Sequence, residues 1–168
     1  MVQVPTWKSI GGSATVVRHG LNLWPPFAFA GIRVAELSSD FRTARVVLRD
    51  NPLTRNYVGT QFGGSIFAMT DPFWMFLTLR GLGDDYIVWD QAAEVRFVLP
   101  GRGRLTATFE VTPEFLDEVR EAAESGDKVL RWCETDVIDE SGHVVATVRK
   151  QLYVRRKKAA RVAMGAPA

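Results

Sequence analysis

The most constraining feature of this sequence is a long apolar run that carries a single charged residue. Between Arg55 and Arg80 lie 24 residues, and Asp71 is the only carboxylate among them. Such a run is typical of a helix that other elements bury on all sides. A carboxylate in that setting loses its hydration, which raises its pKa and costs stability unless a partner stabilises the charge. We therefore expect a buried central helix in which Asp71 is a candidate functional residue.

A proline follows Asp71 and disturbs the helix at the same point. Because Pro72 lacks an N–H group, we expect a kink there and a free carbonyl at Ala68. The alternative is that Asp71 only caps a helix that begins at the proline. We favour a functional Asp71, because Gly63 and Gly64 offer a better helix start upstream.

Composition indicates an ordinary globular chain. Its 168 residues are 46% hydrophobic and 24% charged, and the net charge of +2 gives no reason to expect a nucleic-acid partner. The apolar run contains Asp71 and Pro72 and has no second such segment beside it, so we expect no membrane insertion. The lone Cys133 cannot form an internal disulfide, and no charged-then-apolar leader opens the sequence. These features favour a cytoplasmic protein.

The pattern of the chain predicts one α+β domain over residues 1–168, with a helical extension at 1–26 and a flexible tail at 156–168. A helix at residues 6–23 should stop at Trp24-Pro25-Pro26. Thr112 and Pro113 should begin a short surface helix. Alternating apolar residues and turn signals predict strands at 32–37, 43–48, 86–99, 105–111, 128–138 and 143–154. We expect these strands to form a curved antiparallel sheet around the central helix.

The motifs resemble those of a known enzyme superfamily. Residues 56–64 read Asn-Tyr-Val-Gly-Thr-Gln-Phe-Gly-Gly, and Asp71 follows seven residues later. This is similar to the pattern Asn-x-x-Gly-x-x-His-Gly-Gly with a catalytic acid seven residues on, found in acyl-CoA thioesterases of the phenylacetate-pathway type. Residues 68–73, 86–90 and 152–157 resemble the DUF4442 branch of that superfamily. The resemblance covers about residues 30–157 and implies the hotdog fold.

The expected chemistry centres on the start of the central helix. Unpaired N–H groups at Gly63 and Gly64 could bond a thioester carbonyl and the oxyanion it becomes; the alternative is a tight turn with close helix packing. Asp71, about two turns along at ~1.5 Å per residue, lies near the edge of such a site and could activate water or attack directly. The resemblance gives Asn56 the role of orienting the water or the carboxylate. Its alternative is a loop Asn that bonds its own backbone.

Two positions depart from the family pattern. Asp90 stands where relatives have a Ser or Thr that contacts the catalytic acid from the neighbouring subunit, and Phe62 stands where they have a His. Two adjacent carboxylates share a proton, so Asp90 could donate to Asp71 or act as the base itself. The alternative is a strand-end Asp paired with Arg96 or another cation. Phe62 makes the pocket wall more apolar.

Aromatic residues are the candidates for binding the acyl group. We assign this role to Phe62, Phe73, Trp74 and Trp89, although the cluster around Phe73 is also typical of a core. No metal site is expected, because neither histidine has ligand spacing with the other or with the cysteine.

The resemblance implies a thioesterase acting on a medium-chain or aromatic acyl-CoA, with no cofactor beyond the coenzyme A of the substrate. We expect a homodimer, which could pair again into a homotetramer. The alternative is a non-catalytic hotdog protein that binds an acyl ligand or acyl-CoA. A hydratase is disfavoured, since that class uses Asp-x-x-x-x-His and residue 76 is Phe.

Overall fold

The computed structural model describes residues 12–157, and its elements follow the predicted order. All six predicted strands are present, while residues 6–11 of the predicted helix and residues 158–168 of the predicted tail lie outside the described residues. The elements are α1 (Ala14–Leu23), α2 (Pro25–Ala30), β1 (Ile32–Leu37), β2 (Thr43–Leu48), η1 (Pro52–Thr54), α3 (Gly63–Ala68), α4 (Phe73–Leu82), β3 (Tyr86–Phe97), β4 (Leu105–Glu110), α5 (Pro113–Ala122), β5 (Val129–Ile138) and β6 (Val144–Arg156).

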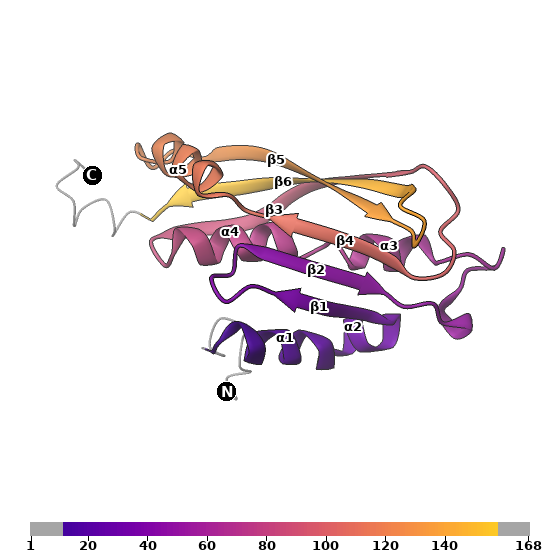
Figure 1. The fold of residues 1–168 in the computed structure, drawn as a ribbon. Helices are drawn as coiled ribbons and strands as arrows, with labels where there is room; N and C mark the ends of the chain where they lie inside the picture. Colours follow the sequence, from indigo (N-terminus) through magenta and orange to yellow (C-terminus); the bar gives the residue numbers. More distant parts are fainter. Residues whose placement is uncertain (1–11, 158–168) are drawn as a thin grey trace, which may run out of the picture.

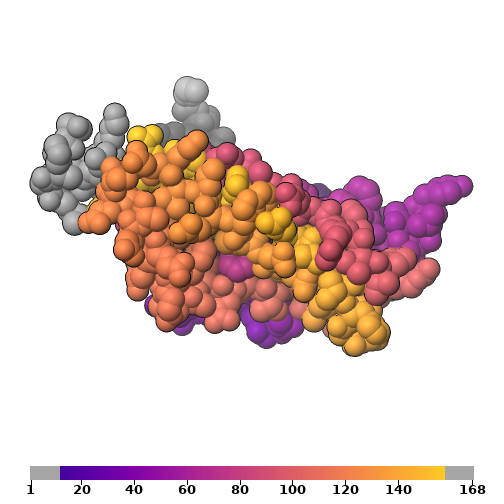
Figure 2. Space-filling model, turned by 90° about the horizontal axis from the view of Figure 1, so that it is seen from above, coloured from indigo at the N-terminus to yellow at the C-terminus, as the bar shows by residue number. Residues whose placement is uncertain are grey.

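One antiparallel sheet contains all six strands, in the order β1-β2-β4-β5-β6-β3. Figure 1 shows the sheet curving past α3 and α4, with α1 and α2 along β1 and α5 close to β5. Phe73 of α4 lies in the core between Phe27 and Phe109, with ring centroids 6.1 Å and 5.0 Å away. The predicted α+β class, with an antiparallel sheet packed on a central helix and a helix before it, is confirmed. Seen from above, the outer surface is formed by α5, β5 and β6 together with β3 (Figure 2).

The N-terminal segment contains a second helix that was not predicted. Helix α1 ends at Leu23, as predicted, and Pro25 and Pro26 follow it without a loop. They occupy the first positions of α2. Proline is well suited there, because the first turn of a helix has no acceptor for its N–H groups and needs the φ that proline already has.

The central helix is broken where Pro72 predicted a kink. Helix α3 ends at Ala68, a short turn follows, and α4 begins at Phe73. The Ala68 carbonyl is not free, however, because the turn lets Asp71 N donate to it at 3.3 Å. Asp71 does not cap α4 either, since Pro72 is the N-cap residue and no side chain bonds there. None of the helices in the described range has the length and hydropathy needed to cross a membrane.

The two edges of the sheet differ in whether other elements cover them. Side chains of α1 cover the β1 edge: Asn22 bonds both backbone groups of Val34, at 2.7 Å and 3.1 Å, and Arg18 Nη1 donates to Ala35 O at 2.8 Å. The outer edge of β3 meets no other strand within residues 12–157. Most side chains from Gln91 to Pro100 are exposed. An open edge of this kind is a ready surface for pairing with another strand.

Candidate active site

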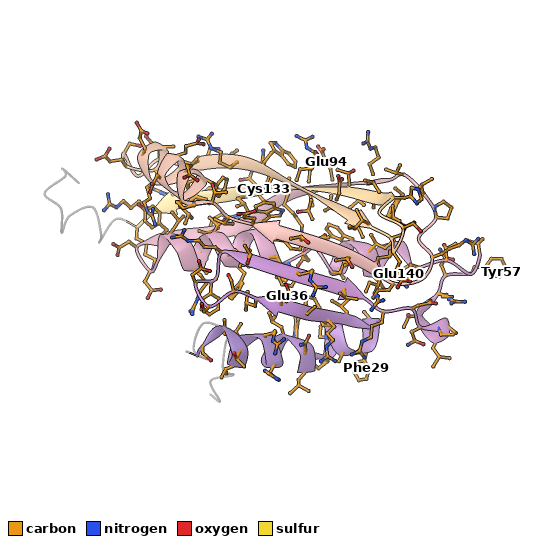
Figure 3. All side chains as sticks on the ribbon, in the orientation of Figure 1. Phe29, Glu36, Tyr57, Glu94, Cys133 and Glu140 are labelled. Atoms are coloured by element: carbon orange, nitrogen blue, oxygen red, sulfur yellow. The ribbon has the colours of Figure 1, made fainter. Side chains whose placement is uncertain are left out.

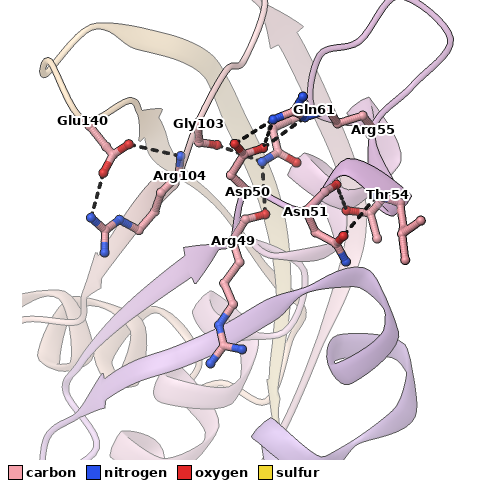
Figure 4. Close-up of polar contacts among 10 residues, drawn as sticks. Arg49, Asp50, Asn51, Thr54, Arg55, Gln61, Gly103, Arg104 and Glu140 are labelled. Atoms are coloured by element: carbon pink, nitrogen blue, oxygen red, sulfur yellow. Dashed lines mark hydrogen bonds and ion pairs between the residues drawn. The ribbon is translucent and has the colours of Figure 1, made fainter.

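The loop before α3 is anchored by the buried side chain of Gln61. Its Nε2 donates to Arg49 O at 3.1 Å and to Gly103 O at 2.8 Å (Figure 4). Its backbone N–H donates to Gly101 O at 2.8 Å. Three bonds from one residue to two other segments fix the point at which α3 begins. Beyond this anchor, Tyr57 projects from the loop into solvent (Figure 3).

Asn56 uses its amide group to fold this loop. Its Oδ1 accepts from the N–H groups of Val58 at 3.1 Å and Thr60 at 3.0 Å, and its Nδ2 donates to Thr60 Oγ1 at 2.8 Å. These are the local backbone bonds of the alternative considered for this residue. Asn56 nevertheless lies on the wall of the hollow beside α3.

A hollow of about 430 Å³ lies at the start of α3. Its wall is mostly apolar, and it is lined by Asn56, Val58, Thr60, Gln61, Gly63, Ile66, Phe97, Val98, Leu99, Pro100 and Gly101. Gly63 packs closely on Phe97, because a Cβ at residue 63 would lie 2.9 Å from the Phe97 ring and the ring would have to shift. Within residues 12–157 the N–H groups of Gly63 and Gly64 donate to no acceptor. One such N–H group therefore lies on the wall of the hollow, as expected for an oxyanion donor.

Phe62 is the N-cap residue of α3 and lies against the second glycine. A Cβ at Gly64 would be 2.4 Å from the Phe62 ring, so close packing also accounts for this glycine. The Phe62 side chain is largely exposed. Phe62 places an apolar ring at the helix start but does not line the hollow.

Asp71 is more exposed than its sequence context suggested. Its side chain is 54% exposed in the chain, so the expected desolvation is wrong for this residue. The reason is the break between α3 and α4, which turns the carboxylate out of the core. Oδ1 accepts from Lys150 Nζ at 2.6 Å, while Oδ2 accepts no hydrogen bond from the described residues. Asp71 does not line the hollow at Gly63.

Lys150 is the functional candidate that sequence reasoning missed. It lies on β6 at an inward position between Val148 and Leu152, and its side chain is 2% exposed. Its ammonium lies 4.5 Å from the centre of the Phe67 ring as well as next to Asp71. The signal was in the sequence, because residues 148, 150, 152 and 154 share one face of a strand and only 150 is charged.

Asp90 is the second carboxylate at this lysine. Its Oδ2 lies 3.3 Å from Lys150 Nζ, and its buried Oδ1 has no hydrogen-bond partner. Burial raises the pKa of Asp90, the Lys150 charge opposes that rise, and the Asp71 charge adds to it. Asp90 and Asp71 of the same chain therefore lie close together, because both contact Lys150. The cation next to Asp90 is Lys150, not the Arg96 considered from the sequence. A bulge in β3 after Asp90 changes the register with β6.

Cys133 is the cross-strand neighbour of Lys150 on β5. Burial, with a smaller effect of the Asp90 charge, raises the pKa of the Cys133 thiol to about 12. A thiol with this pKa stays protonated and unreactive near neutral pH. Among residues 12–157 no group of His, Cys, Asp and Glu side chains is placed to hold a metal ion.

The predicted aromatic wall residues lie in three different places. Phe73 is fully buried in the core, and Trp74 packs on Phe109 while its Nε1 donates to Thr135. Trp89 is exposed on the other face of the sheet and stacks on Tyr153, with centroids 4.0 Å apart. Neither these three residues nor Phe62 line the hollow. The aromatic residue in the wall of the hollow is Phe97.

The fold is the hotdog fold, as similar solved structures indicate. A probable thioesterase from Pseudomonas aeruginosa, PA5026, superposes with a TM-score of 0.73 at 21% identity, over 85% of this chain and 95% of that one. The thioesterase HI1161 of Haemophilus influenzae gives 0.63 at 13% identity, over 87% and 92%. The PaaI protein of the E. coli phenylacetic acid degradation operon gives 0.54 at 15% identity, over 83% and 88%.

Residues 12–154 match the family of a domain of unknown function, DUF4442, and the chain is a member of that family. A search of curated proteins gave no significant match. At these identities the solved structures establish the fold alone.

Proposed function

We propose that the protein hydrolyses an acyl-CoA or a related thioester, with Asp71 as the base that activates water. The observation that carries this proposal is the state of the Asp71 carboxylate. One oxygen is fixed by a buried ammonium at 2.6 Å, the other accepts no hydrogen bond from the described residues, and the side chain is 54% exposed. A carboxylate held in this way is oriented and still able to accept a proton.

In the proposed reaction Asp71 Oδ2 takes a proton from water as the water oxygen attacks the thioester carbonyl carbon. The carbonyl oxygen becomes an oxyanion, which the free N–H groups of Gly63 and Gly64 would bond. The intermediate then collapses by breaking the C–S bond. The thiolate takes up the proton, and the products are a carboxylic acid and the thiol of coenzyme A. Direct attack by Asp71 remains the second route from the same carboxylate.

A site of this kind needs two copies of the chain. Asp71 lies beyond the end of α3, in the break before α4, and does not line the hollow at Gly63. In a single chain the carboxylate and the Gly63 N–H group therefore do not share one hollow. We propose that β3 pairs with β3 of a second copy, so that Asp71 of one chain faces Gly63 of the other. The open β3 edge supports this arrangement.

The hollow indicates the chemistry of the substrate. Its lining by Val58, Phe97, Val98 and Leu99 favours a medium-chain or aromatic acyl group, or the apolar parts of a pantetheine arm. The same apolar lining, with Phe62 in place of the histidine of the resembled family, also favours the second candidate. This is a protein that binds an acyl ligand or acyl-CoA without turning it over.

A substrate screen separates the two candidates. Short, medium, long and aromatic acyl-CoA thioesters are incubated with the protein, and the released thiol is detected with a colorimetric thiol reagent. The proposal expects release with at least one medium-chain or aromatic thioester. Saturable binding by calorimetry with no thiol release would support the binding protein instead. Neither binding nor release across the panel would contradict both.

A further inference from the structure

Lys150 is the one buried charged residue in the described range, and it has two acidic partners. Its ammonium contacts Asp71 Oδ1 at 2.6 Å and Asp90 Oδ2 at 3.3 Å, and it lies 4.5 Å from the Phe67 ring centre. A buried ammonium is costly unless a counter-ion stays beside it. One carboxylate is enough to neutralise it.

The second carboxylate therefore needs an explanation. Asp90 is only 21% exposed, and its Oδ1 is buried without a hydrogen-bond partner. Packing alone would be served better by an apolar or amide side chain. A second carboxylate becomes useful when the first one loses its charge, which is what a general base does in each turnover.

We propose that Lys150 is a positioning residue that joins Asp71 and Asp90 into one charge-sharing unit, in which Asp90 stays the counter-ion while Asp71 gains and loses a proton. The functional part of this inference rests on the proposed role of Asp71 as the base. In the resting state Lys150 holds Oδ1 of Asp71 and leaves Oδ2 to accept a proton from water. Once Asp71 is neutral, the ammonium pairs with Asp90 alone. Release of the proton to the leaving thiolate restores the first state.

Within residues 12–157, three titratable groups lie next to Lys150 on the surrounding elements. They are Asp71 from the turn between α3 and α4, Asp90 from β3 and Cys133 from β5. Cys133 keeps its proton, because burial raises its pKa to about 12. Proton exchange in the unit is therefore confined to the two carboxylates.

The unit can be tested without any substrate. Carbon-detected NMR of labelled aspartates follows the titration of Asp90 in the wild type and in single variants. Asp71→Asn should lower the pKa of Asp90, because that carboxylate loses a like charge and keeps the ammonium. Lys150→Met should raise the pKa of Asp90, because the charge that opposes the effect of burial is lost. Asp117→Asn on α5 is the control and should leave the pKa of Asp90 unchanged.

The Asp71→Asn variant makes the test robust to misfolding. It preserves size and a carbonyl acceptor, so it carries the result even where Lys150→Met does not fold. A lower pKa of Asp90 in Asp71→Asn supports the unit. A pKa of Asp90 that Asp71→Asn leaves unchanged overturns it.

Turnover provides a separate readout. Asp90→Asn should lower kcat with KM changed only a few-fold, and should shift the acid limb of the pH–kcat profile to lower pH. Lys150→Arg should retain more of kcat than Lys150→Met. If the wild type hydrolyses no thioester, the proposed function fails, while a lower pKa of Asp90 in Asp71→Asn would still support the charge-sharing unit. A wild-type kcat and pH profile in Asp90→Asn would overturn the role of Asp90 as counter-ion.

Discussion

The indole Nε1 of Trp74 donates a 2.6 Å hydrogen bond to Thr135 Oγ1, and this bond joins α4 to the inner face of β5. Thr135 is buried and Trp74 is half-buried, so an indole N–H left without this acceptor would lose its one hydrogen-bond partner among the described residues. We expect Thr135→Val to lower the free energy of unfolding by about 1–3 kcal/mol. Thr135→Ser keeps the acceptor and loses one methyl group. Urea unfolding of both variants checks this, and a valine variant as stable as the wild type would contradict it.

Cys133 should be unreactive in the folded protein. Its thiol is buried, and its pKa is raised to about 12, so almost no thiolate is present near neutral pH. A colorimetric disulfide reagent should react slowly with the native chain and fast in denaturant. Rapid labelling of the native protein would show that the pocket around Cys133 opens. The slow reaction also means that this thiol adds little background to a thiol-release assay.

Asp90 should make folding stability depend on pH. Burial raises its pKa in the folded chain, whereas the unfolded chain has the ordinary value. Between the two values the folded state binds more protons, so this group's contribution to stability falls as pH rises through that interval. Asp90→Asn should remove the fall. Urea unfolding of wild type and variant at a series of pH values, starting near the ordinary carboxyl pKa, measures it. The same pH slope in both proteins would be inconsistent with a raised Asp90 pKa.

The chain should be a homodimer in solution, paired through β3. Phe97 on that strand is exposed in the single chain, as is Phe29 on α2 at the opposite edge of the sheet. Phe97→Lys should weaken the dimer, because it would bury a charge at the pairing edge. The matched control Phe29→Lys should not. Light scattering at micromolar concentration checks both variants, and a monomeric wild type would exclude the two-chain site.

The sequence predicts most of the fold because its local signals agree with one another. The β1 and β2 boundaries match the expectation at both ends, since each strand is bounded by residues that favour turns. Thr112 caps α5 as expected, accepting from Phe115 N at 3.2 Å. Pro25 follows the end of α1, as expected, but it also begins α2, which was not predicted, because proline can start a helix as readily as it stops one.

Candidate site residues could be predicted from the sequence where their motif lies on one continuous segment of the chain. Gly63 and its unpaired N–H follow from the helix start alone. Lys150 was missed because its partners come from 79 residues and 60 residues away along the chain, on elements that only the folded sheet brings together. The exposure of Asp71 was misjudged for a related reason, since an apolar neighbourhood in sequence does not fix which side of a helix break faces solvent.

The measurement that tests the central claim most directly is the turnover of Asp71→Asn on the best acyl-CoA substrate of the screen. The variant keeps a carbonyl oxygen for Lys150 and removes the proton acceptor. We expect kcat to fall by about 100-fold or more while KM changes only a few-fold, since the lost interaction is made in the transition state. Asp117→Asn should turn over like the wild type. Wild-type turnover in a folded Asp71→Asn protein would contradict the account.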